Sequence, residues 1–319
     1  MGLAPPDGRS QFSIKMMGAL VVVAKRKGRL MRLKFGWILG LATALLAVGQ
    51  ASAAGLGVPE PLQLGLQAPA TPVAESINQF HTFLLWLITL ISLFVLGLLL
   101  AVIIKFNAKS NPEPSRTTHN TMIEVVWTVV PVLILIVVAI PSFRLLYLQR
   151  DFPDADMTIK ATSSQWYWTY DYPDNGDINF DSVMKTREEL TGDEQYLFAV
   201  DNPIVVPVNK TVRLIATSND VIHAWTIPSF GSKIDAIPGR LNETWFKATI
   251  EGNYYGQCSE LCGKDHAYMP IAVRVVSEAE FNTWVSTTKS AGLQKANEWL
   301  TAHIAAKDKV ALADQKSAE

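Results

Sequence analysis

Cysteine and charge are both scarce in this sequence. The 319 residues include two cysteines, and Asp, Glu, Lys and Arg make up 18% of the chain, against roughly 25% in a typical soluble domain. Two cysteines cannot build a disulfide-dense scaffold, and 28 basic against 29 acidic residues leave no positive excess for a nucleic-acid partner. With 49% hydrophobic residues and a mean hydropathy of +0.18, the chain is not disordered, and membrane segments are expected.

Residues 36–53 have the pattern of a secretory signal peptide. Arg32 and Lys34 precede a short apolar run, which ends in an Ala-Ser-Ala tripeptide typical of a cleavage site. A transmembrane anchor is the alternative interpretation of this run. Residues 1–30 fit no standard signal, so translation starts either at residue 1, with a long basic region, or at Met31.

Two further apolar runs are long enough to cross a bilayer. Residues 83–104 and 125–143 contain 22 and 19 residues without a charge, and about 20 helical residues span a hydrocarbon core. The short polar loop between them favours a membrane hairpin over the buried helices of a globular protein. Pro131 and Pro141 are expected to kink the second helix, which membrane helices tolerate.

Lysine and arginine predict the orientation of the hairpin. The loop between the spans carries Lys105, Lys109 and Arg116, whereas residues 54–80 carry none. The positive-inside rule then places the loop in the cytoplasm and both flanks outside, although two arginines beyond the second span weaken the rule. A signal peptide that exports the N-terminus agrees with this orientation.

The chain from about residue 151 predicts an exported β domain. Runs of β-branched and aromatic residues alternate with turn formers such as Pro173–Gly176 and Val208–Lys210, and many short strands at this spacing indicate a sandwich or barrel. The expected strands cover residues 157–162, 165–172, 204–208, 211–217, 224–228, 241–250 and 271–276.

Helical signals and a sorted charge distribution complete the domain. Ser277 and Glu280 form a capping box that opens a helix through Trp284, and an alanine-rich helical tail follows from about Gly292 to Ala313. Residues 151–276 contain 10 Lys and Arg against 18 Asp and Glu, a net charge of −8, whereas residues 1–53 carry +7. The near-zero net charge of the whole chain therefore conceals one negatively and one positively charged segment.

The two cysteines belong to a compact set of metal donors. Cys258, Cys262, His266 and Met269 form a C-x3-C-x3-H-x2-M pattern, and His223 offers a second imidazole at a predicted strand start. Thiolate, imidazole and thioether donors together favour copper. A disulfide in an oxidising compartment and a zinc site remain open, whereas a mononuclear blue-copper site needs one cysteine fewer.

Motifs in a fixed order carry a resemblance to a known family. They are Glu124-Val125-Val126-Trp127, Gln165-Trp166-Tyr167-Trp168, Val221-Ile222-His223-Ala224-Trp225, Lys233-Ile234-Asp235-Ala236-Ile237-Pro238-Gly239-Arg240 and Tyr254-Tyr255-Gly256-Gln257-Cys258-Ser259-Glu260-Leu261-Cys262-Gly263. With the membrane hairpin in front, the chain closely resembles subunit II of cytochrome c oxidase over roughly residues 75–285. The resemblance implies a two-helix transmembrane hairpin followed by an all-β, cupredoxin-like Greek-key barrel and a C-terminal helical tail.

The expected domain boundaries follow from both arguments. They are a signal peptide (1–53), a periplasmic N-terminal segment (54–80), the transmembrane hairpin (81–148), the cupredoxin-like copper domain (149–290) and the tail (291–319).

The resemblance implies a dinuclear copper centre, copper A. The implied ligands are two bridging thiolates, three terminal side chains and one backbone carbonyl: Cys258, Cys262, His223, His266, Met269 and Glu260. The Glu260 carboxylate would also bind a magnesium or manganese ion shared with subunit I, since carboxylates suit such hard ions.

The resemblance also implies roles in electron and proton transfer and in docking. Trp166 matches the aromatic residue through which cytochrome c delivers its electron, and Glu124 matches a glutamate at the cytoplasmic mouth of a proton path into subunit I. The net charge of −8 suits a lysine-rich cytochrome c. The acids that match its contacts are Asp171, Asp181, Asp201 and Asp220.

The implied function is that of the electron-accepting subunit of a bacterial haem–copper oxidase in the inner membrane. Electrons from cytochrome c pass through copper to the haem of subunit I, where oxygen is reduced to water and protons are pumped. The expected partners are subunits I and III and cytochrome c, with both termini and the copper domain in the periplasm. A quinol-oxidase subunit II without copper is the alternative, and the complete ligand set argues against it.

Two other classes fit less well. A nitrous-oxide-reductase type of electron module shares the copper motif but lacks this membrane hairpin. A fused cytochrome c subunit needs a C-x-x-C-H motif, which the sequence lacks.

Overall fold

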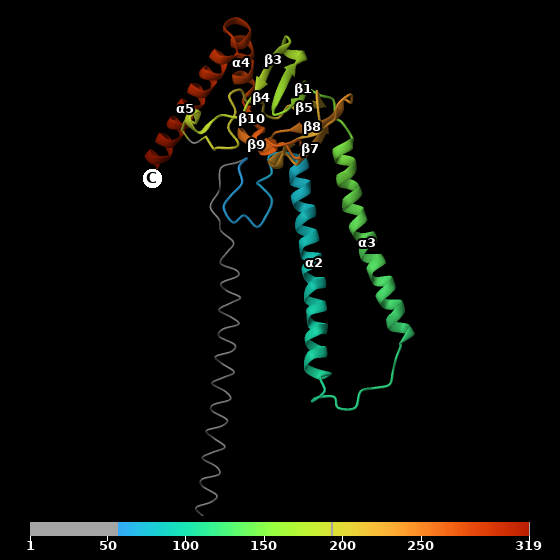
Figure 1. Cartoon of the computed structure of the whole chain (residues 1–319). Coiled ribbons are helices and arrows are strands. Elements are labelled where there is room, and N and C mark those ends of the chain that lie inside the picture. The colour runs from blue at the N-terminus through green and yellow to red at the C-terminus, as the bar shows by residue number, and fades with distance from the viewer. Residues whose placement is uncertain (1–56, 193, 319) are drawn as a thin grey trace, which may run out of the picture. The chain divides into compact units, whose positions relative to one another are not determined.

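The computed structural model describes residues 57–192 and 194–318, and the expected signal peptide lies outside them. Two long helices, α2 (Pro72–Lys105) and α3 (Thr121–Arg150), form a hairpin below a β domain (Figure 1). Both helices are long and apolar enough to cross a membrane. The side chains of Thr71 and Asn120 cap their N-termini by accepting backbone N–H groups.

Both helices extend beyond the predicted spans. α2 begins at Pro72, eleven residues before the apolar run that starts at Phe83, and its first turns carry polar residues such as Glu75 and Asn78. The expected hairpin boundary at residue 81 therefore falls inside a continuous helix. Apolar composition predicts the segment that lipid can accept, whereas a good cap and a proline at the first helical position decide where the helix starts.

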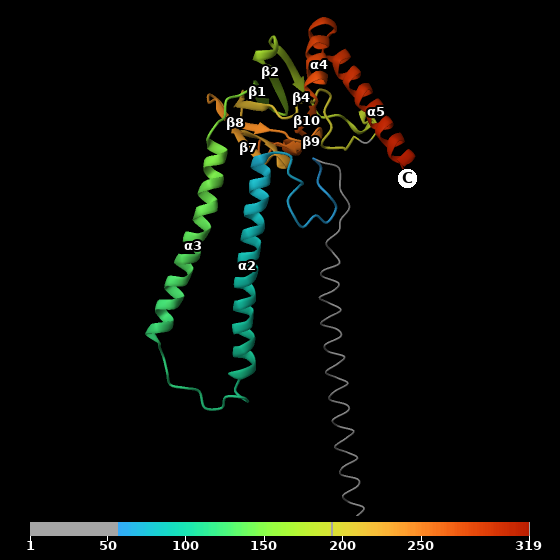
Figure 2. The same cartoon turned by 180° about the vertical axis from the view of Figure 1, so that it is seen from behind.

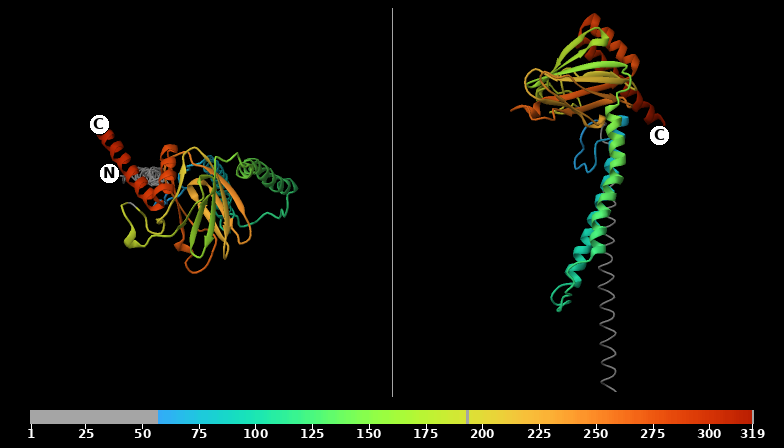
Figure 3. Two further views of the ribbon diagram at one scale, coloured as in Figure 1. Left: turned by 90° about the horizontal axis from the view of Figure 1, so that it is seen from above. Right: turned by 90° about the vertical axis from the view of Figure 1, so that its right-hand side faces the viewer.

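The β domain contains ten strands in three sheets. They are β1 (Met157–Ser164), β2 (Tyr167–Tyr172), β3 (Ile178–Ser182), β4 (Ile204–Pro207), β5 (Thr211–Ser218), β6 (His223–Ile227), β7 (Ser232–Ala236), β8 (Asn242–Lys247), β9 (Gly252–Gln257) and β10 (Pro270–Val276). The sheet orders are β3-β2-β1-β5-β8, β4-β10-β9 and β6-β7. The β1–β5 and β4–β10 pairs are parallel and the others are antiparallel, and Figure 3 shows the strands stacked in layers.

The seven predicted strands are present, and three were missed. β7 and β9 carry Asp, Lys, Asn or Gly at several positions, so their apolar alternation is weak. β3 does alternate, with Ile178 and Phe180 buried, but it is five residues long and contains Asn and Asp, which are rare in strands. The strand predicted from Gln165 begins only at Tyr167, because Gln165 and Trp166 form a turn between β1 and β2.

The C-terminal helices are part of the domain. α4 (Glu278–Ala291) opens with the predicted Ser277–Glu280 capping box, and α5 (Leu293–Ala318) follows directly (Figure 2). Ala296 and Leu300 of α5 are fully buried in the same core as Trp284 of α4. The expected boundary between domain and tail at residue 291 therefore cuts through one hydrophobic core.

Candidate metal centre

A single hairpin loop carries both cysteines. Gln257 and Pro270 pair across β9 and β10, so residues 258–269 form the loop that joins these strands. The base of the loop is closed by a hydrogen bond of 3.3 Å, in which the Cys258 N–H donates to the Met269 carbonyl. The sheet thus places the first and last donors of the loop opposite each other.

The strand that carries His223 lies beside this loop. His223 is the first residue of β6, as predicted, and the next residue, Ala224, accepts a hydrogen bond from the Ser259 N–H at 3.1 Å. β9 approaches β6 so closely that a Cβ on Gly256 would lie 1.7 Å from the Thr226 carbonyl oxygen. Only glycine allows this approach, which brings the histidine to the cysteine loop.

The Cys262 sulfur lies in contact with the sulfur atoms of Cys258 and Met269. The Sγ atoms of Cys258 and Cys262 are 3.8 Å apart, and the Met269 Sδ is 3.6 Å from the Cys262 Sγ. The cysteine separation is far above the roughly 2.05 Å of a disulfide, and both thiols are free and buried. It is also below twice the roughly 2.3 Å of a metal–thiolate bond, so one ion can contact both sulfurs.

Two imidazoles and a carbonyl complete the set. The Nδ1 of His223 lies 3.2 Å from Met269 Sδ and 3.8 Å from Cys258 Sγ. The Nδ1 of His266 lies 3.4 Å from Cys262 Sγ, and the Glu260 carbonyl oxygen 3.3 Å from Cys258 Sγ. The structure therefore brings all six predicted donors together at one place.

Three of these donors form a buried group that could hold a metal ion. The ligand atoms of His223, Cys258 and Cys262 all lie within 4.8 Å of one another, and the three side chains are buried. Soft donors in a buried pocket fit copper, and the charge of a bound ion would compensate the buried thiolates.

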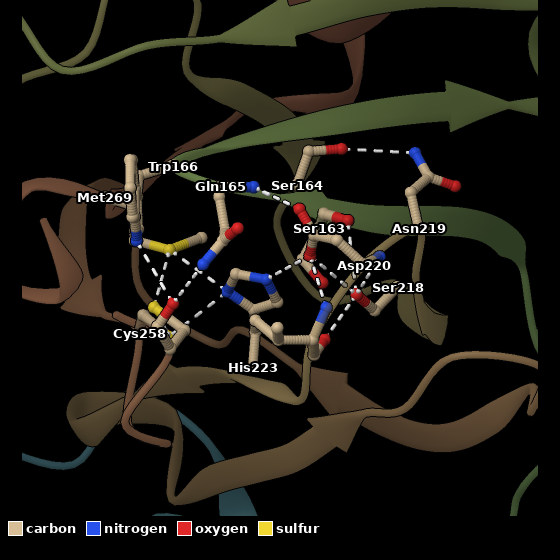
Figure 4. A network of polar contacts seen from close by, with 12 residues as sticks. Ser163, Ser164, Gln165, Trp166, Ser218, Asn219, Asp220, His223, Cys258 and Met269 are labelled. Carbon is tan, nitrogen blue, oxygen red and sulfur yellow. Dashed lines mark hydrogen bonds and ion pairs between the residues drawn. The ribbon is translucent and has the colours of Figure 1, made fainter. Parts of the chain in front are cut away.

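Asp220 fixes the orientation of His223 (Figure 4). Its Oδ1 lies 2.8 Å from His223 Nε2, so a protonated Nε2 donates to the carboxylate and leaves Nδ1 free to face the sulfurs. Burial raises the pKa of Asp220, but hydrogen bonds from His223, Val221 N–H and Gln165 N–H outweigh it and hold the pKa below its usual value. The carboxylate is therefore charged at neutral pH.

The two thiols differ in acidity. Burial raises the pKa of Cys258, but its contacts with His223 and with the backbone near Glu260 and Ala224 lower the pKa to about 7. Burial and the neighbouring Cys258 thiolate raise the pKa of Cys262 to about 12. The metal-free pair thus keeps at least one proton near neutral pH, which metal binding must displace.

Trp166 packs directly on the cysteine loop. Its indole N–H donates to the Cys262 carbonyl at 3.3 Å, and the Gln165 side-chain amide donates to the same oxygen at 2.7 Å. A Cβ on Gly263 would meet both side chains at 3.0 Å, so glycine leaves the room that this packing needs. The Lys264 ammonium lies 5.6 Å from the centre of the indole ring.

Sequence reasoning missed two of the contacts around the centre. Gln165 ties the β1–β2 turn both to the loop and to Asp220, because its N–H donates to the Asp220 Oδ2 at 2.7 Å. The buried Trp168 ring stands edge-on to His223 with centroids 6.2 Å apart. The Asp-x-x-His spacing of Asp220 and His223 was a usable signal for the carboxylate–imidazole pair.

The other predicted residues lie away from the donor set. The Glu260 side chain is exposed at the loop, and Glu124 lies in the first turn of α3. Asp171 and Asp181 lie on adjacent strands β2 and β3, where they accept hydrogen bonds from Asn179 and Thr169. Asp201 is exposed and accepts the Val183 N–H at the end of β3.

Comparison with known proteins gives matches along most of the chain. The profile of the cytochrome c oxidase subunit II transmembrane domain matches residues 59–145, and that of the subunit II periplasmic domain matches residues 157–276. The probable cytochrome c oxidase subunit 2 of Rickettsia bellii is 51% identical over 245 residues, which cover 77% of this chain and 91% of that protein.

A less similar relative and a solved structure are also described as subunit II of cytochrome c oxidase. Cytochrome c oxidase subunit 2 of Cereibacter sphaeroides is 43% identical over 267 residues, covering 78% of this chain and 88% of its own. The crystal structure of the periplasmic domain of cytochrome oxidase subunit II from Bradyrhizobium japonicum is 62% identical, covers 43% of this chain and 96% of that one, and has a TM-score of 0.40. By its two matching domains and these relatives, the chain belongs to the cytochrome c oxidase subunit II family.

Proposed function

We propose that this subunit receives electrons from cytochrome c at a dinuclear copper centre and passes them to the haem of subunit I. The observation that carries the proposal is the convergence of two thiolates, two imidazoles, a thioether and a carbonyl at one buried loop. Six donors exceed what a single tetrahedral ion needs. A copper pair bridged by both thiolates would accept and release one electron with little change in ligand geometry.

The distances favour one division of the terminal donors. His223 Nδ1 and Met269 Sδ are 3.2 Å apart and would suit one ion, which leaves His266, 3.4 Å from Cys262 Sγ, and the Glu260 carbonyl, 3.3 Å from Cys258 Sγ, for the other. Cys258 and Cys262 would serve both ions. The protein's part is to hold these groups rigidly: Asp220 orients His223, and the β9–β10 hairpin fixes Cys258 opposite Met269.

Electrons would reach the centre through Trp166. The indole lies between solvent and the loop and is bonded to the Cys262 carbonyl, so it offers a short path to a bridging ligand. We expect Trp166→Gln, measured in the assembled oxidase, to slow reduction by cytochrome c at least tenfold while the copper content stays at the wild-type value.

A conservative variant and a control make this test specific. Trp166→Phe keeps an aromatic ring and should retain more of the rate than the glutamine variant. Trp299→Phe, at a half-buried position of α5 where the ring stacks on His303, should change neither the rate nor the copper content. Loss of copper from Trp166→Gln would show that the residue holds the loop rather than carries electrons.

Two further roles depend on the partner subunit. Glu260 would supply its carboxylate to a magnesium or manganese ion at the boundary with subunit I, and its exposure at the loop suits a shared site. Glu124, in the first turn of α3, would take up protons at the cytoplasmic end. Unchanged manganese binding in Glu260→Gln, or unchanged proton uptake in Glu124→Gln, would contradict the respective role.

The membrane placement follows from the same proposal. We place the β domain and both termini in the periplasm of a bacterial inner membrane, with the basic loop between α2 and α3 in the cytoplasm. Subunits I and III would surround the hairpin, and the residues 1–53 would be removed on export. Protease digestion of right-side-out spheroplasts should cut the β domain and spare the α2–α3 loop.

A further inference from the structure

The segment that precedes α2 exposes a ridge of leucines. Leu62 and Leu64 are 97% and 89% exposed, and Leu66 is 47% exposed. Single exposed leucines are common on proteins, but these three alternate within five residues. Since Leu62 and Leu64 bury almost no surface and Leu66 only about half of its own, folding of the subunit does not account for them.

The backbone at Leu62 is also unfavourable for leucine. The Gln63 N–H donates to the Glu60 carbonyl at 3.3 Å, which closes a tight turn with Leu62 at its third position. The φ of Leu62 is +58°, in the left-handed region that such turns normally give to Gly or Asn. The most exposed position of the segment thus carries an apolar side chain that neither the turn nor water favours.

Both ends of this leucine loop, residues 57–71, are fixed to the β domain. At one end the Gly57 carbonyl accepts the Tyr255 N–H at 3.1 Å, and at the other the Ala70 N–H donates to the Ser229 carbonyl at 2.8 Å. The Thr71 hydroxyl donates to the Phe230 carbonyl at 2.7 Å, and α2 starts at the next residue. The loop is therefore held next to the point where the chain turns toward the membrane.

The loop lies beside the first turns of α2 in Figures 1 and 2 and in the right-hand view of Figure 3. Those turns are polar, and the apolar run of α2 begins at Phe83. At about 1.5 Å of rise per residue, Phe83 lies about 17 Å along the helix from Pro72. Because the loop lies alongside these turns, its tip extends toward the part of α2 where the apolar run starts.

We propose that Leu62, Leu64 and Leu66 insert into the lipid bilayer where α2 enters it and form an interfacial anchor for the β domain. Lipid suits the loop better than a protein surface does, because the loop lies beside the first turns of α2, whose apolar run begins at Phe83. The loop contains no Lys or Arg and a single acid, Glu60, so it offers little for polar recognition. The Glu60 N–H donates to the Gln63 side chain at 3.1 Å, so two backbone N–H groups of the turn, those of Glu60 and Gln63, are bonded within it and need no water.

The proposal can be tested on the assembled oxidase in phosphatidylcholine nanodiscs, independently of electron transfer. Leu62→Cys and, separately, Leu64→Cys would be labelled with an environment-sensitive fluorophore, while the buried Cys258 and Cys262 stay protected. Phe94→Cys in the middle of α2 serves as the lipid-facing control and the exposed Asn282→Cys on α4 as the aqueous control. Copper content equal to wild type verifies that each variant is folded.

The two quenchers distinguish lipid, water and protein. We expect doxyl lipids to quench the labels at positions 62 and 64 several-fold more than the label at position 282, and aqueous iodide to do the reverse. Labels at positions 62 and 64 that respond to iodide as position 282 does would overturn the proposal. Protection from both quenchers would overturn it too, because the loop would then pack on another subunit.

Discussion

At the scale of single residues, the Asp220 carboxylate links His223 to the β1–β2 turn that carries Trp166. One carboxylate oxygen lies 2.8 Å from His223 Nε2, and the other accepts the Gln165 N–H at 2.7 Å, next to Trp166. The same carboxylate therefore holds the proposed copper ligand His223 and the turn that carries the proposed electron path. The resemblance to known proteins points instead to a contact with cytochrome c, and both roles are compatible with its partly exposed side chain.

Removing this carboxylate should weaken copper binding. Asp220→Ala leaves the buried Nε2–H of His223 without a partner, so we expect copper affinity to fall about 10- to 100-fold, as for other residues that orient a ligand. Asp220→Asn keeps an acceptor oxygen and should retain most of the affinity. Competition with a copper chelator measures both.

Asp181→Ala provides the matched control for this prediction. The Asp181 carboxylate accepts the hydroxyl of Thr169 across the β2–β3 pair rather than a group of the metal site, so copper affinity should not change. If the acids also steer cytochrome c, both alanine variants will slow association at low salt, and the difference from wild type will shrink as ionic strength rises. Equal copper affinity in Asp220→Ala and wild type would rule out the positioning role.

At the scale of elements, α4 and α5 are joined to the β domain by buried and charged contacts. Glu280 is 8% exposed, accepts from the Ser277 N–H and hydroxyl, and pairs with Lys307 and His303 of α5. Burial raises the pKa of Glu280, but the bonds from Ser277 and the charge of Lys307 outweigh it, so its pKa lies below the usual value. This carboxylate caps α4 and attaches α5 to it.

The lowered pKa of Glu280 predicts a loss of stability in acid. A carboxyl group with a depressed folded pKa stabilises the fold fully above its unfolded pKa of about 4.3, and this contribution disappears as the pH falls through the folded value. The difference in unfolding free energy between wild type and Glu280→Gln should therefore be present at pH 7 and vanish on acidification. A difference that stays constant down to pH 2 would contradict the assignment.

The elements also show what the sequence could and could not predict. Strong β-branched runs such as Ile204–Pro207 and the Ser277 capping box were recognisable locally. β9 could not be recognised in this way, because Gly252 and Gly256 disfavour a strand in isolation. Gly256 is required by the close approach of Thr226, which is a tertiary contact. The packing of Leu300 into the core could not be predicted either, because the sequence of an alanine-rich helix does not indicate which of its faces packs against a neighbour.

At the scale of the whole molecule, the excess negative charge and the metal donors lie in one region of the chain, and a group of basic residues lies in another. Residues 151–276 carry a net charge of −8 around a buried set of soft donors, whereas the basic residues between the spans lie in the α2–α3 loop. The metal donors were predictable because five of the six lie within twelve residues of sequence, and His223 was found by elimination among five histidines. The Gln165 contacts with Asp220 and Cys262 were not proposed, because they depend on how distant parts of the chain meet, whereas the Asp220–His223 pair had a local signal in its spacing that was not used.

The central claim is that one chain binds two copper ions at shared thiolates. The most direct measurement is copper analysis and electron paramagnetic resonance of the full chain, purified in detergent without its haem subunits and loaded with copper. The account predicts two coppers per chain and a seven-line hyperfine pattern, because one unpaired electron is shared by two equivalent copper nuclei. One copper per chain with a four-line pattern, or a disulfide between Cys258 and Cys262 in the active oxidase, would contradict it.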